Sequence, residues 1–250
     1  MDEPEAYKIG WQPFLGLKIY LDSRPLIPRS ETEWWTEQLL KKLIGRESSE
    51  SFSVVRLGLA ARSATEKGSG GERHLRLLDL CAGSGAIGCA MLSRLPNAQV
   101  YFGEIDPVHE PTILKNIREN NLDASPYFAK ATKGTRADVR IGDLFEPFGD
   151  MKFDFIAVNP PYIPAERVLP ASVVDYEPSL ALRSGADGLD LMRRIATDIS
   201  KYLKRSGIAW IECDSPSAEA ASRLFTTQGL TAEIRTDQYG KPRVIVVSFP

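Results

Sequence analysis

The sequence predicts an α/β protein in which helices cover both faces of a mostly parallel β-sheet. Between residues 75 and 213, short apolar runs alternate with longer segments of helical periodicity, as in parallel strands joined by crossover helices. A glycine-rich turn follows the first of these runs. The last two runs, 230–235 and 243–249, have no helix between them, so we expect an antiparallel hairpin at the sheet edge.

The first 45 residues predict a short hairpin followed by a helix. Residues 19–21 and 24–27 flank a turn-forming pair at 22–23, and we expect them to be the two strands. Ser30 and Glu33 have the spacing of a capping box, which predicts a helix that runs from there to Gly45. The apolar stripe of this helix consists of Trp34, Trp35, Leu39, Leu40 and Leu43. We therefore divide the chain into a hairpin segment, 1–29, and a larger domain, 30–250.

The other elements follow from periodicity and from clusters of Gly, Pro and Ser. Residues 46–73 are rich in Ser, Gly and charge and predict a mobile insertion, within which 52–60 could form a short ordered piece. Loops are expected at 122–136 and at the Pro-rich 160–178. We expect strands at 75–80, 99–105, 137–141, 153–158 and 208–213, and helices from the glycine-rich turn to about 95 and at 111–121, 189–203 and 217–228.

Composition narrows the class of protein. At 43% hydrophobic and 26% charged residues, the chain has the composition of a soluble globular protein. A net charge of -2 gives no positive field toward nucleic acid or an anionic membrane, so neither is an expected partner. Three cysteines without paired or zinc-type spacing favour a reducing compartment, either the cytoplasm or the mitochondrial matrix, and no metal site. The acidic start resembles neither a secretory signal nor a transit peptide.

The glycine-rich turn predicts a nucleotide-type cofactor site. Gly83, Gly85 and Gly88 satisfy G-x-G-x-x-G, which by itself is weak support for a dinucleotide. Asp79 precedes them at the strand end, where an anion would repel a pyrophosphate but could pair with the ammonium of S-adenosylmethionine. Glu104 ends the next strand, where a carboxylate can accept hydrogen bonds from both ribose hydroxyls of either cofactor. Asp79 therefore favours S-adenosylmethionine, with S-adenosylhomocysteine as the product.

Further residues complete this expected cofactor site. Asp143 follows the third strand, where its carboxylate could accept from the exocyclic amine of adenine while Leu144 or Phe145 packs on the ring. A turn Asp before a core Phe explains the same residues equally well. Cys81 is interpreted as a small turn residue rather than a reactive thiol. The candidate cofactor-binding set is Asp79, Cys81, Ala82, Gly83, Ser84, Gly85, Glu104, Asp143, Leu144 and Asn159.

The loop after the fourth strand predicts the chemistry. Asn159-Pro160-Pro161-Tyr162 would lie at the carboxyl edge of the sheet, where open α/β folds bind ligands. Two prolines fix the backbone and leave the Pro160 carbonyl free to accept, and the Asn159 side-chain oxygen is a second acceptor. Two acceptors that bind the N–H groups of a planar nitrogen can aim its lone pair at a methyl donor. Tyr162 offers a flat face to a planar group. We therefore assign catalysis to Asn159, Pro160 and Tyr162.

At this point the chain resembles the HemK/PrmC family of protein-(glutamine-N5) methyltransferases. The resemblance rests on Leu-Ile-Pro-Arg at 26–29 together with Asn-Pro-Pro-Tyr at 159–162, and it extends over almost the whole chain. It implies a Rossmann-like class I methyltransferase fold that uses S-adenosylmethionine. The implied substrate is the glutamine of the Gly-Gly-Gln motif in a peptide-chain release factor. It also implies that Arg29 lies near the active-site mouth, and that residues 1–29 are the remnant of a substrate-binding region.

Other functions remain open on the residues alone. Asn-Pro-Pro-Tyr also occurs in enzymes that methylate the amino nitrogen of adenine or cytosine in RNA or DNA. The three glycines and Glu104 would suit an NAD-dependent oxidoreductase, which would leave the Asn159 loop without a role. A non-catalytic binding module that has kept the fold is a further alternative. The oligomeric state, the particular release factor and the role of 46–73 do not follow from the sequence.

Overall fold

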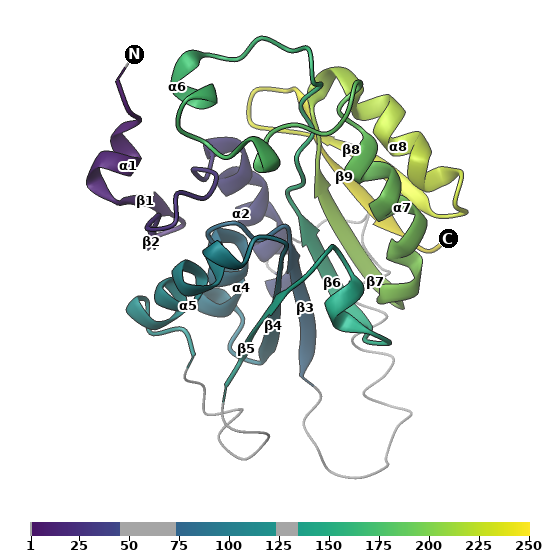
Figure 1. The fold of residues 1–250 in the computed structure, drawn as a ribbon. Helices are drawn as coiled ribbons and strands as arrows, with labels where there is room; N and C mark the ends of the chain where they lie inside the picture. Colours follow the sequence, from purple (N-terminus) through teal and green to yellow (C-terminus); the bar gives the residue numbers. More distant parts are fainter. Residues whose placement is uncertain (1, 46–73, 124–134) are drawn as a thin grey trace.

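The computed structural model describes residues 2–45, 74–123 and 135–250 (Figure 1). The strands are β1 (Trp11–Phe14), β2 (Leu17–Tyr20), β3 (Leu75–Leu80), β4 (Ala98–Glu104), β5 (Ala137–Ile141), β6 (Phe153–Val158), β7 (Leu203–Glu212), β8 (Thr231–Thr236) and β9 (Pro242–Ser248). The helices are α1 (Glu5–Ile9), α2 (Ser30–Ile44), α4 (Ala86–Arg94), α5 (Glu110–Glu119), α6 (Ala171–Val174), α7 (Asp190–Tyr202) and α8 (Ala218–Thr226). None of the helices in these ranges is long and apolar enough to cross a membrane.

Seven strands form one sheet in the order β5-β4-β3-β6-β7-β9-β8. Strands β3 to β7 pair in parallel, whereas β9 pairs antiparallel with both β7 and β8. This arrangement confirms the predicted mostly parallel sheet with an antiparallel hairpin at its edge. The strand order reverses direction between β3 and β6, and open α/β sheets bind ligands beside such a point. The loops that follow β3 and β6 are those that carry the glycine-rich turn and Asn159.

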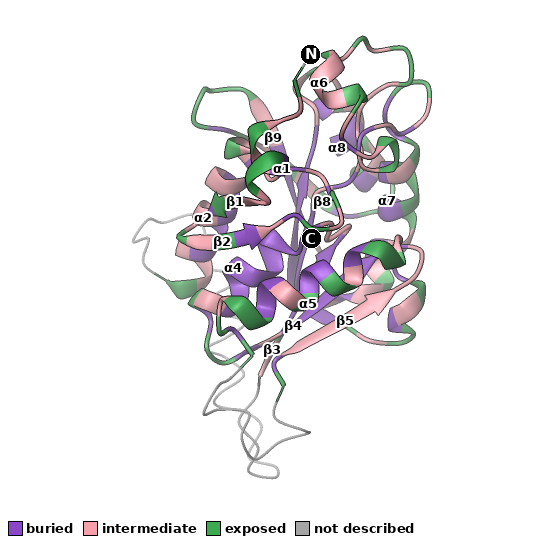
Figure 2. Cartoon of the chain, turned by 60° about the vertical axis from the view of Figure 1, so that its left-hand side comes forward, coloured by how far each residue is buried: buried purple, intermediate pink, exposed green. Residues whose placement is uncertain are grey.

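Helices cover the sheet on both faces, with α2, α4 and α5 on one side and α7 and α8 on the other (Figure 1). Successive residues of β3 divide between two apolar cores, since side chains alternate across a strand. Leu77 packs with α2, α4 and α5, and Leu78 packs with α7 and α8. Figure 2 shows the central strands and the inner faces of the helices as the most buried part of the molecule, whereas the edge strand β5 is of intermediate burial. The two cores fix the sheet edge on which the loops stand.

The predicted hairpin exists, but its position was wrong. Strands β1 and β2 pair antiparallel around Leu15 and Gly16, so the hairpin lies at 11–20 instead of 19–27. Leu15 (φ 49°) and Gly16 (φ 84°) both take the left-handed conformation that a two-residue hairpin turn requires. Arg24 also has a positive φ of 54°, which no strand residue adopts, so residues 24–27 cannot extend as predicted.

The predicted capping box is also absent. Helix α2 does run from Ser30 to Ile44 and ends at Gly45, but its N-cap residue is Arg29 and no side chain caps it. The Glu33 carboxylate instead accepts from the backbone N–H of Leu15 at 2.6 Å. A remote donor in the strained hairpin turn therefore replaces the local partner that the spacing suggested. The apolar stripe of α2 is confirmed, with Trp35, Leu39 and Leu40 buried.

Most other predicted elements are confirmed with shifted ends. Strands β3, β5 and β6 have the predicted bounds, while β7 begins at Leu203, five residues before the predicted 208. A bulge lies between Phe153 and Phe155 where β6 pairs with β7, and across it the partner of β6 steps from Leu203 to Ile208. The insertion at 46–73, with its piece at 52–60, lies outside the described residues, as does most of the loop predicted at 122–136.

Candidate active site

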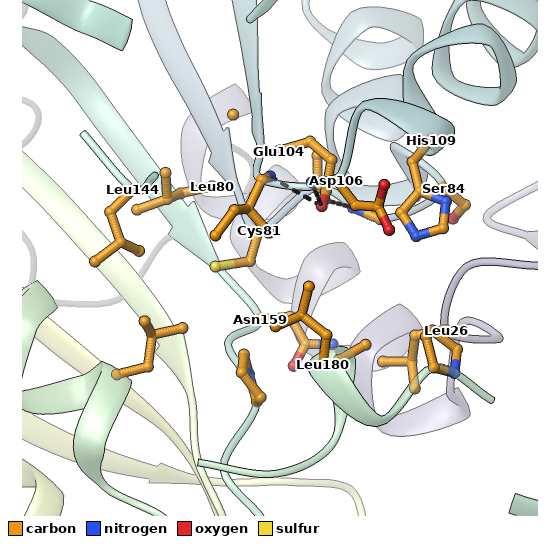
Figure 3. Close-up of a pocket in the computed structure, with 18 of the residues that line it drawn as sticks. Leu26, Leu80, Cys81, Ser84, Glu104, Asp106, His109, Leu144, Asn159 and Leu180 are labelled. Carbon is orange, nitrogen blue, oxygen red and sulfur yellow. Dashed lines mark hydrogen bonds between the residues drawn. The ribbon is translucent and has the colours of Figure 1, made fainter. Parts of the chain in front are cut away.

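A cavity of about 350 Å³ opens at the carboxyl edge of the sheet, beside the point where the strand order reverses. The turns after β3, β4, β5 and β6 form its floor, and residues 26–32 together with 178–194 form its rim. In Figure 3, Asn159, Leu180 and Leu26 face Glu104, Asp106 and Ser84 across the open space. The topology therefore brings the two sequence motifs to opposite walls of one cavity.

The glycine-rich turn forms the wall next to α4. Cys81, Ala82, Gly83 and Ser84 line the cavity. Gly85 does not line it; it has a φ of 76° and is the residue from which α4 begins. Cys81 also adopts a positive φ, and burial raises the pKa of its thiol, which keeps the thiol protonated at neutral pH. A tightly wound turn of this kind suits an organic ligand that packs against backbone.

Asp79 lies beneath this turn, at 0% exposure and outside the set of residues that line the cavity. Its Oδ2 accepts the backbone N–H of Gly88 at 2.8 Å, and its Oδ1 has no partner among the described residues. Burial raises the pKa of Asp79 to about 8, the Gly88 N–H opposes that shift, and the nearby charge of Glu104 adds to it. A buried oxygen without a donor is costly, so this carboxyl group suits a ligand that brings a positive charge to it.

Glu104 ends β4 and does line the cavity, with 6% of its surface exposed. Its Oε2 accepts the N–H of Gly83 at 2.7 Å, and its Oε1 accepts the N–H groups of Ile105 and Asp106 at 2.9 and 3.0 Å (Figure 3). Three backbone donors hold the carboxylate in one orientation. Oε1 already accepts two of these N–H groups, but Oε2 has a lone pair left for a hydroxyl of a ligand, so the predicted ribose interaction is compatible with this geometry at Oε2.

Asp143 and Leu144 follow β5 and line the same cavity. The Asp143 carboxylate accepts from the guanidinium of Arg194 on α7 at 2.7 Å. Leu144 is buried, and Phe145 stacks on Tyr202 with ring centroids 4.5 Å apart, so it packs into the core and is not among the cavity residues. Of the two predicted ring-packing residues, Leu144 is the one that can meet a ligand.

The loop after β6 forms the opposite wall. Asn159 and Pro161 line the cavity, Pro160 is buried, and Tyr162 is not among the lining residues. The Asn159 Nδ2 donates to the hydroxyl of Thr32 at 3.4 Å. Within the described ranges, neither the Asn159 Oδ1 nor the Pro160 carbonyl accepts a hydrogen bond. Both predicted acceptors therefore lack a partner within these ranges, and Asn159 is the one of the two residues that lines the cavity.

Tyr162 is turned toward Glu212, the last residue of β7, and its hydroxyl donates to Glu212 Oε1 at 2.9 Å. Glu212 is 1% exposed, and its Oε2 accepts from Thr32 Oγ1 and from Trp35 Nε1, each at 2.7 Å. Burial raises the pKa of Glu212, and the three donors and the charge of Arg243 oppose that shift. Tyr162 thus anchors the loop through its hydroxyl, an arrangement that sequence reasoning did not foresee.

Arg29 lies at the outer end of this region and not in the cavity wall. Its guanidinium donates to Glu177 Oε1 at 2.5 Å, and Glu177 Oε2 accepts the Ile27 N–H at 3.3 Å. The Glu177 side chain is 1% exposed and that of Arg29 is 37% exposed. The pair therefore joins the segment before α2 to the loop that follows Asn159.

Several residues of the site were missed by sequence reasoning. Glu212 could have been found, since it stands at the carboxyl end of a predicted strand. Arg194 lies within the predicted helix at 189–203, His109 lies two residues before the predicted helix at 111–121, and neither gave a signal. Among the residues that were missed are Leu26, Thr32, Trp35, Asp106, His109, Glu177, Arg194 and Glu212.

Gly188 supports the Asn159 loop from behind, and we expect substitution with alanine to displace that loop. Gly188 has a φ of 80°, and an added Cβ would lie 2.4 Å from the Tyr162 carbonyl oxygen. Gly229 has a φ of 77° with nothing within 4 Å, so Gly229→Ala carries the same backbone strain, about 1 kcal/mol, without the contact. Gly188→Ala should lower turnover at least tenfold and Gly229→Ala less than twofold. Equal turnover in the two variants would show that the contact has no effect on the loop.

Comparison with known proteins agrees with this geometry. Residues 66–173 match the family "Methyltransferase small domain". The release factor glutamine methyltransferase of Streptococcus pneumoniae is 30% identical over 249 residues, covering 98% of this chain and 75% of that protein. The protein of the same name from Geobacter sulfurreducens is 32% identical over 229 residues, covering 91% of this chain and 66% of that protein. Both relatives are longer than the part that this chain matches.

Among solved structures, the N-terminal domain of human METTL16 in complex with SAH has a TM-score of 0.54 and 16% identity, covering 98% of this chain and 78% of that one. The fold, the cavity at the reversal point and the family match together define a methyltransferase. More specifically, the chain belongs to the release factor glutamine methyltransferase family, as the resemblance of its two motifs predicted.

Proposed function

We propose that this protein transfers a methyl group from S-adenosylmethionine to the side-chain amide nitrogen of the Gly-Gly-Gln glutamine in a peptide-chain release factor. The main support is Asn159, which lies on the cavity wall opposite Glu104 and whose Oδ1 has no hydrogen-bond partner among the described residues; the neighbouring Pro160 carbonyl has none there either. The names of its relatives support the release factor as the partner.

The residues that line the cavity, together with Asp79 beneath the glycine-rich turn, fit the proposed methyl donor. Asp79 Oδ1 is a buried acceptor without a donor among the described residues, and an ammonium group would satisfy it. Glu104 would accept from the ribose through Oε2, and Asp143 and Leu144 would meet the adenine. A dinucleotide fits less well, because the Asp79 carboxyl group would lie on the side of its pyrophosphate. When bound, the sulfonium compound supplies an electrophilic methyl group.

The chain's own residues prepare the substrate nitrogen. The lone pair of an amide nitrogen is delocalised, so the free amide is a poor nucleophile. Asn159 Oδ1 and the Pro160 carbonyl would accept its two N–H groups, hold the nitrogen in one orientation and stabilise the positive charge that develops on it. Proline has no backbone N–H to compete at this point. Orientation and fixed dipoles thus account for the transfer without a general base, and the methylated nitrogen gives up one proton to water afterwards.

The proposal is tested by incubating the protein with labelled S-adenosylmethionine and a release factor, followed by mass spectrometry of the Gly-Gly-Gln peptide. We expect the label on the glutamine, and none on a factor in which that glutamine is replaced by alanine. Equal labelling of the two factors would contradict the proposal. Oligonucleotides that contain adenine and cytosine, and calorimetry with NAD against S-adenosylhomocysteine, test the alternatives in parallel.

A further inference from the structure

The buried Glu212 carboxyl group fixes the direction of a short chain of hydrogen bonds that ends at Asn159. Three donors from two other parts of the chain converge on it, namely the Thr32 and Trp35 side chains of α2 and the Tyr162 hydroxyl. Trp35 Nε1 can only donate, and it shares Oε2 with Thr32 Oγ1. In its ionised form the carboxylate accepts all three hydrogen bonds, so Oε2 accepts from Thr32.

In this arrangement the Thr32 hydroxyl donates its only hydrogen to Glu212. Because that hydrogen points to Glu212, Thr32 Oγ1 can offer only lone pairs to Asn159, which donates through Nδ2 at 3.4 Å. The reverse orientation of the Asn159 amide would set Oδ1 against those lone pairs. The two ends of an asparagine amide have nearly the same shape, so their hydrogen-bond partners decide which end faces where.

We infer that Glu212 is a positioning residue that determines, through Thr32, which end of the Asn159 amide meets the substrate. The inference rests on the proposed function, in which Asn159 Oδ1 accepts an N–H of the substrate amide. With the amide reversed, the NH2 group of Asn159 would face the NH2 group of the glutamine, and the substrate would be held poorly. The same orientation of the Asn159 amide disfavours a substrate with glutamate in place of the glutamine, because the glutamate carboxylate would face the Asn159 Oδ1.

Two side-chain series test this direction. Thr32→Val removes the hydroxyl and keeps the shape, whereas Thr32→Ser keeps the hydroxyl. Thr36 is a matched control, since it is equally buried on the same helix and bonds to the Thr32 carbonyl instead of Glu212. The second series is at Glu212. In Glu212→Gln, the side-chain oxygen can still accept from Thr32 and Trp35 while the NH2 group faces Tyr162. In Glu212→Leu, no oxygen is left to accept from them. All kcat values are measured on the release factor, together with Kd for S-adenosylhomocysteine.

We expect Thr32→Val to lower kcat at least 30-fold and Glu212→Leu to lower it at least 100-fold. The conservative variants should keep more activity: Thr32→Ser at least a fifth, and Glu212→Gln at least a tenth, of the wild-type kcat. Thr36→Val should change kcat less than twofold, and Kd for S-adenosylhomocysteine should stay within threefold throughout. Equal kcat for Thr32→Val and Thr32→Ser would overturn the inference. So would a kcat for Glu212→Gln as low as that of Glu212→Leu.

A spectroscopic measurement separates this inference from the proposed function. In protein labelled with 15N-asparagine, the Asn159 side-chain signal is assigned by its loss in Asn159→Ala. Hydrogen exchange of that NH2 group should be at least tenfold faster in Thr32→Val than in wild type, and unchanged in Thr36→Val. Unchanged exchange in Thr32→Val would refute the hydrogen-bond chain. A wild-type protein that leaves the release factor unmodified would refute the proposed function, and the exchange measurement would still decide the chain.

Discussion

Asn159→Ala should lower turnover by about 10²–10³-fold, the loss that follows removal of one preorganised hydrogen-bonding group at a reacting centre. The substitution deletes the Oδ1 acceptor and leaves the Pro160 carbonyl to hold the substrate nitrogen alone. Binding of S-adenosylhomocysteine should remain within a few-fold, because the glycine-rich turn, Glu104 and Asp143 line the cavity independently of this side chain. The loss should therefore appear in kcat more than in cofactor affinity.

Asn120→Ala is the matched control for this variant. The Asn120 side chain also hydrogen-bonds across elements, to the backbone of Lys18 in β2, but it lies outside the cavity. Its removal should cost some stability and leave turnover close to wild type. Single-turnover kinetics with saturating cofactor make the comparison. An Asn159→Ala protein that turns over as fast as Asn120→Ala would remove Asn159 from the mechanism.

Asp79→Asn should weaken binding of S-adenosylhomocysteine by about 10²-fold, as truncation of a buried charged partner commonly does. Burial raises the pKa of the wild-type carboxyl group to about 8, so near pH 7 it is mostly protonated in the ligand-free protein. An ammonium that binds there must expel that proton. Affinity should therefore rise about tenfold per pH unit from pH 6 to 8 and level off above, with close to one proton released at pH 7.

Calorimetry in buffers of different ionisation enthalpy measures that proton directly. Stability provides a second readout. The folded pKa of about 8 lies above the unfolded value of 3.8, so the folded state holds the extra proton between the two. Stability of the ligand-free protein should accordingly fall as pH rises through that window, by several kcal/mol as an order of magnitude, and Asp79→Asn should remove this slope. Proton release by Asp79→Asn equal to that of wild type would place the titrating group elsewhere.

The parts of the fold that the sequence predicted well are those governed by local pattern. Strands β3, β5 and β6 were predicted to the residue because each is a short run bounded by turn residues. Strand β7 was cut short, because residues 204–207 are polar or Gly and fall in the bulge between the paired residues Leu203 and Ile208, which no local signal predicts. The hairpin was misplaced because its turn contains Leu15 at a positive φ, and leucine is not a residue type from which such a turn is predicted.

The same distinction holds at the site. Contiguous motifs gave Asn159, Glu104 and the glycine-rich turn, because a loop after a parallel strand must stand at the sheet edge. The contact of Thr32 with Glu212 joins residues 180 positions apart and arises from the packing of α2 against the end of β7. A capping box was inferred from the spacing of Ser30 and Glu33, but the tertiary partner of Glu33 outcompeted the local one. Sequence motifs therefore predict which loops stand at the sheet edge, but they do not predict contacts between residues that are far apart in the chain.

The position of β9 between β7 and β8 has a consequence for how the polypeptide acquires its structure. β8 reaches the sheet through β9, which comes later in the chain. A nascent chain that has emerged only as far as residue 241 holds β8 without its neighbour and leaves the β7 edge exposed. Completion of the sheet therefore has to wait until residues 242–248 have left the ribosome, and a stop codon just before Pro242 should yield an aggregation-prone species.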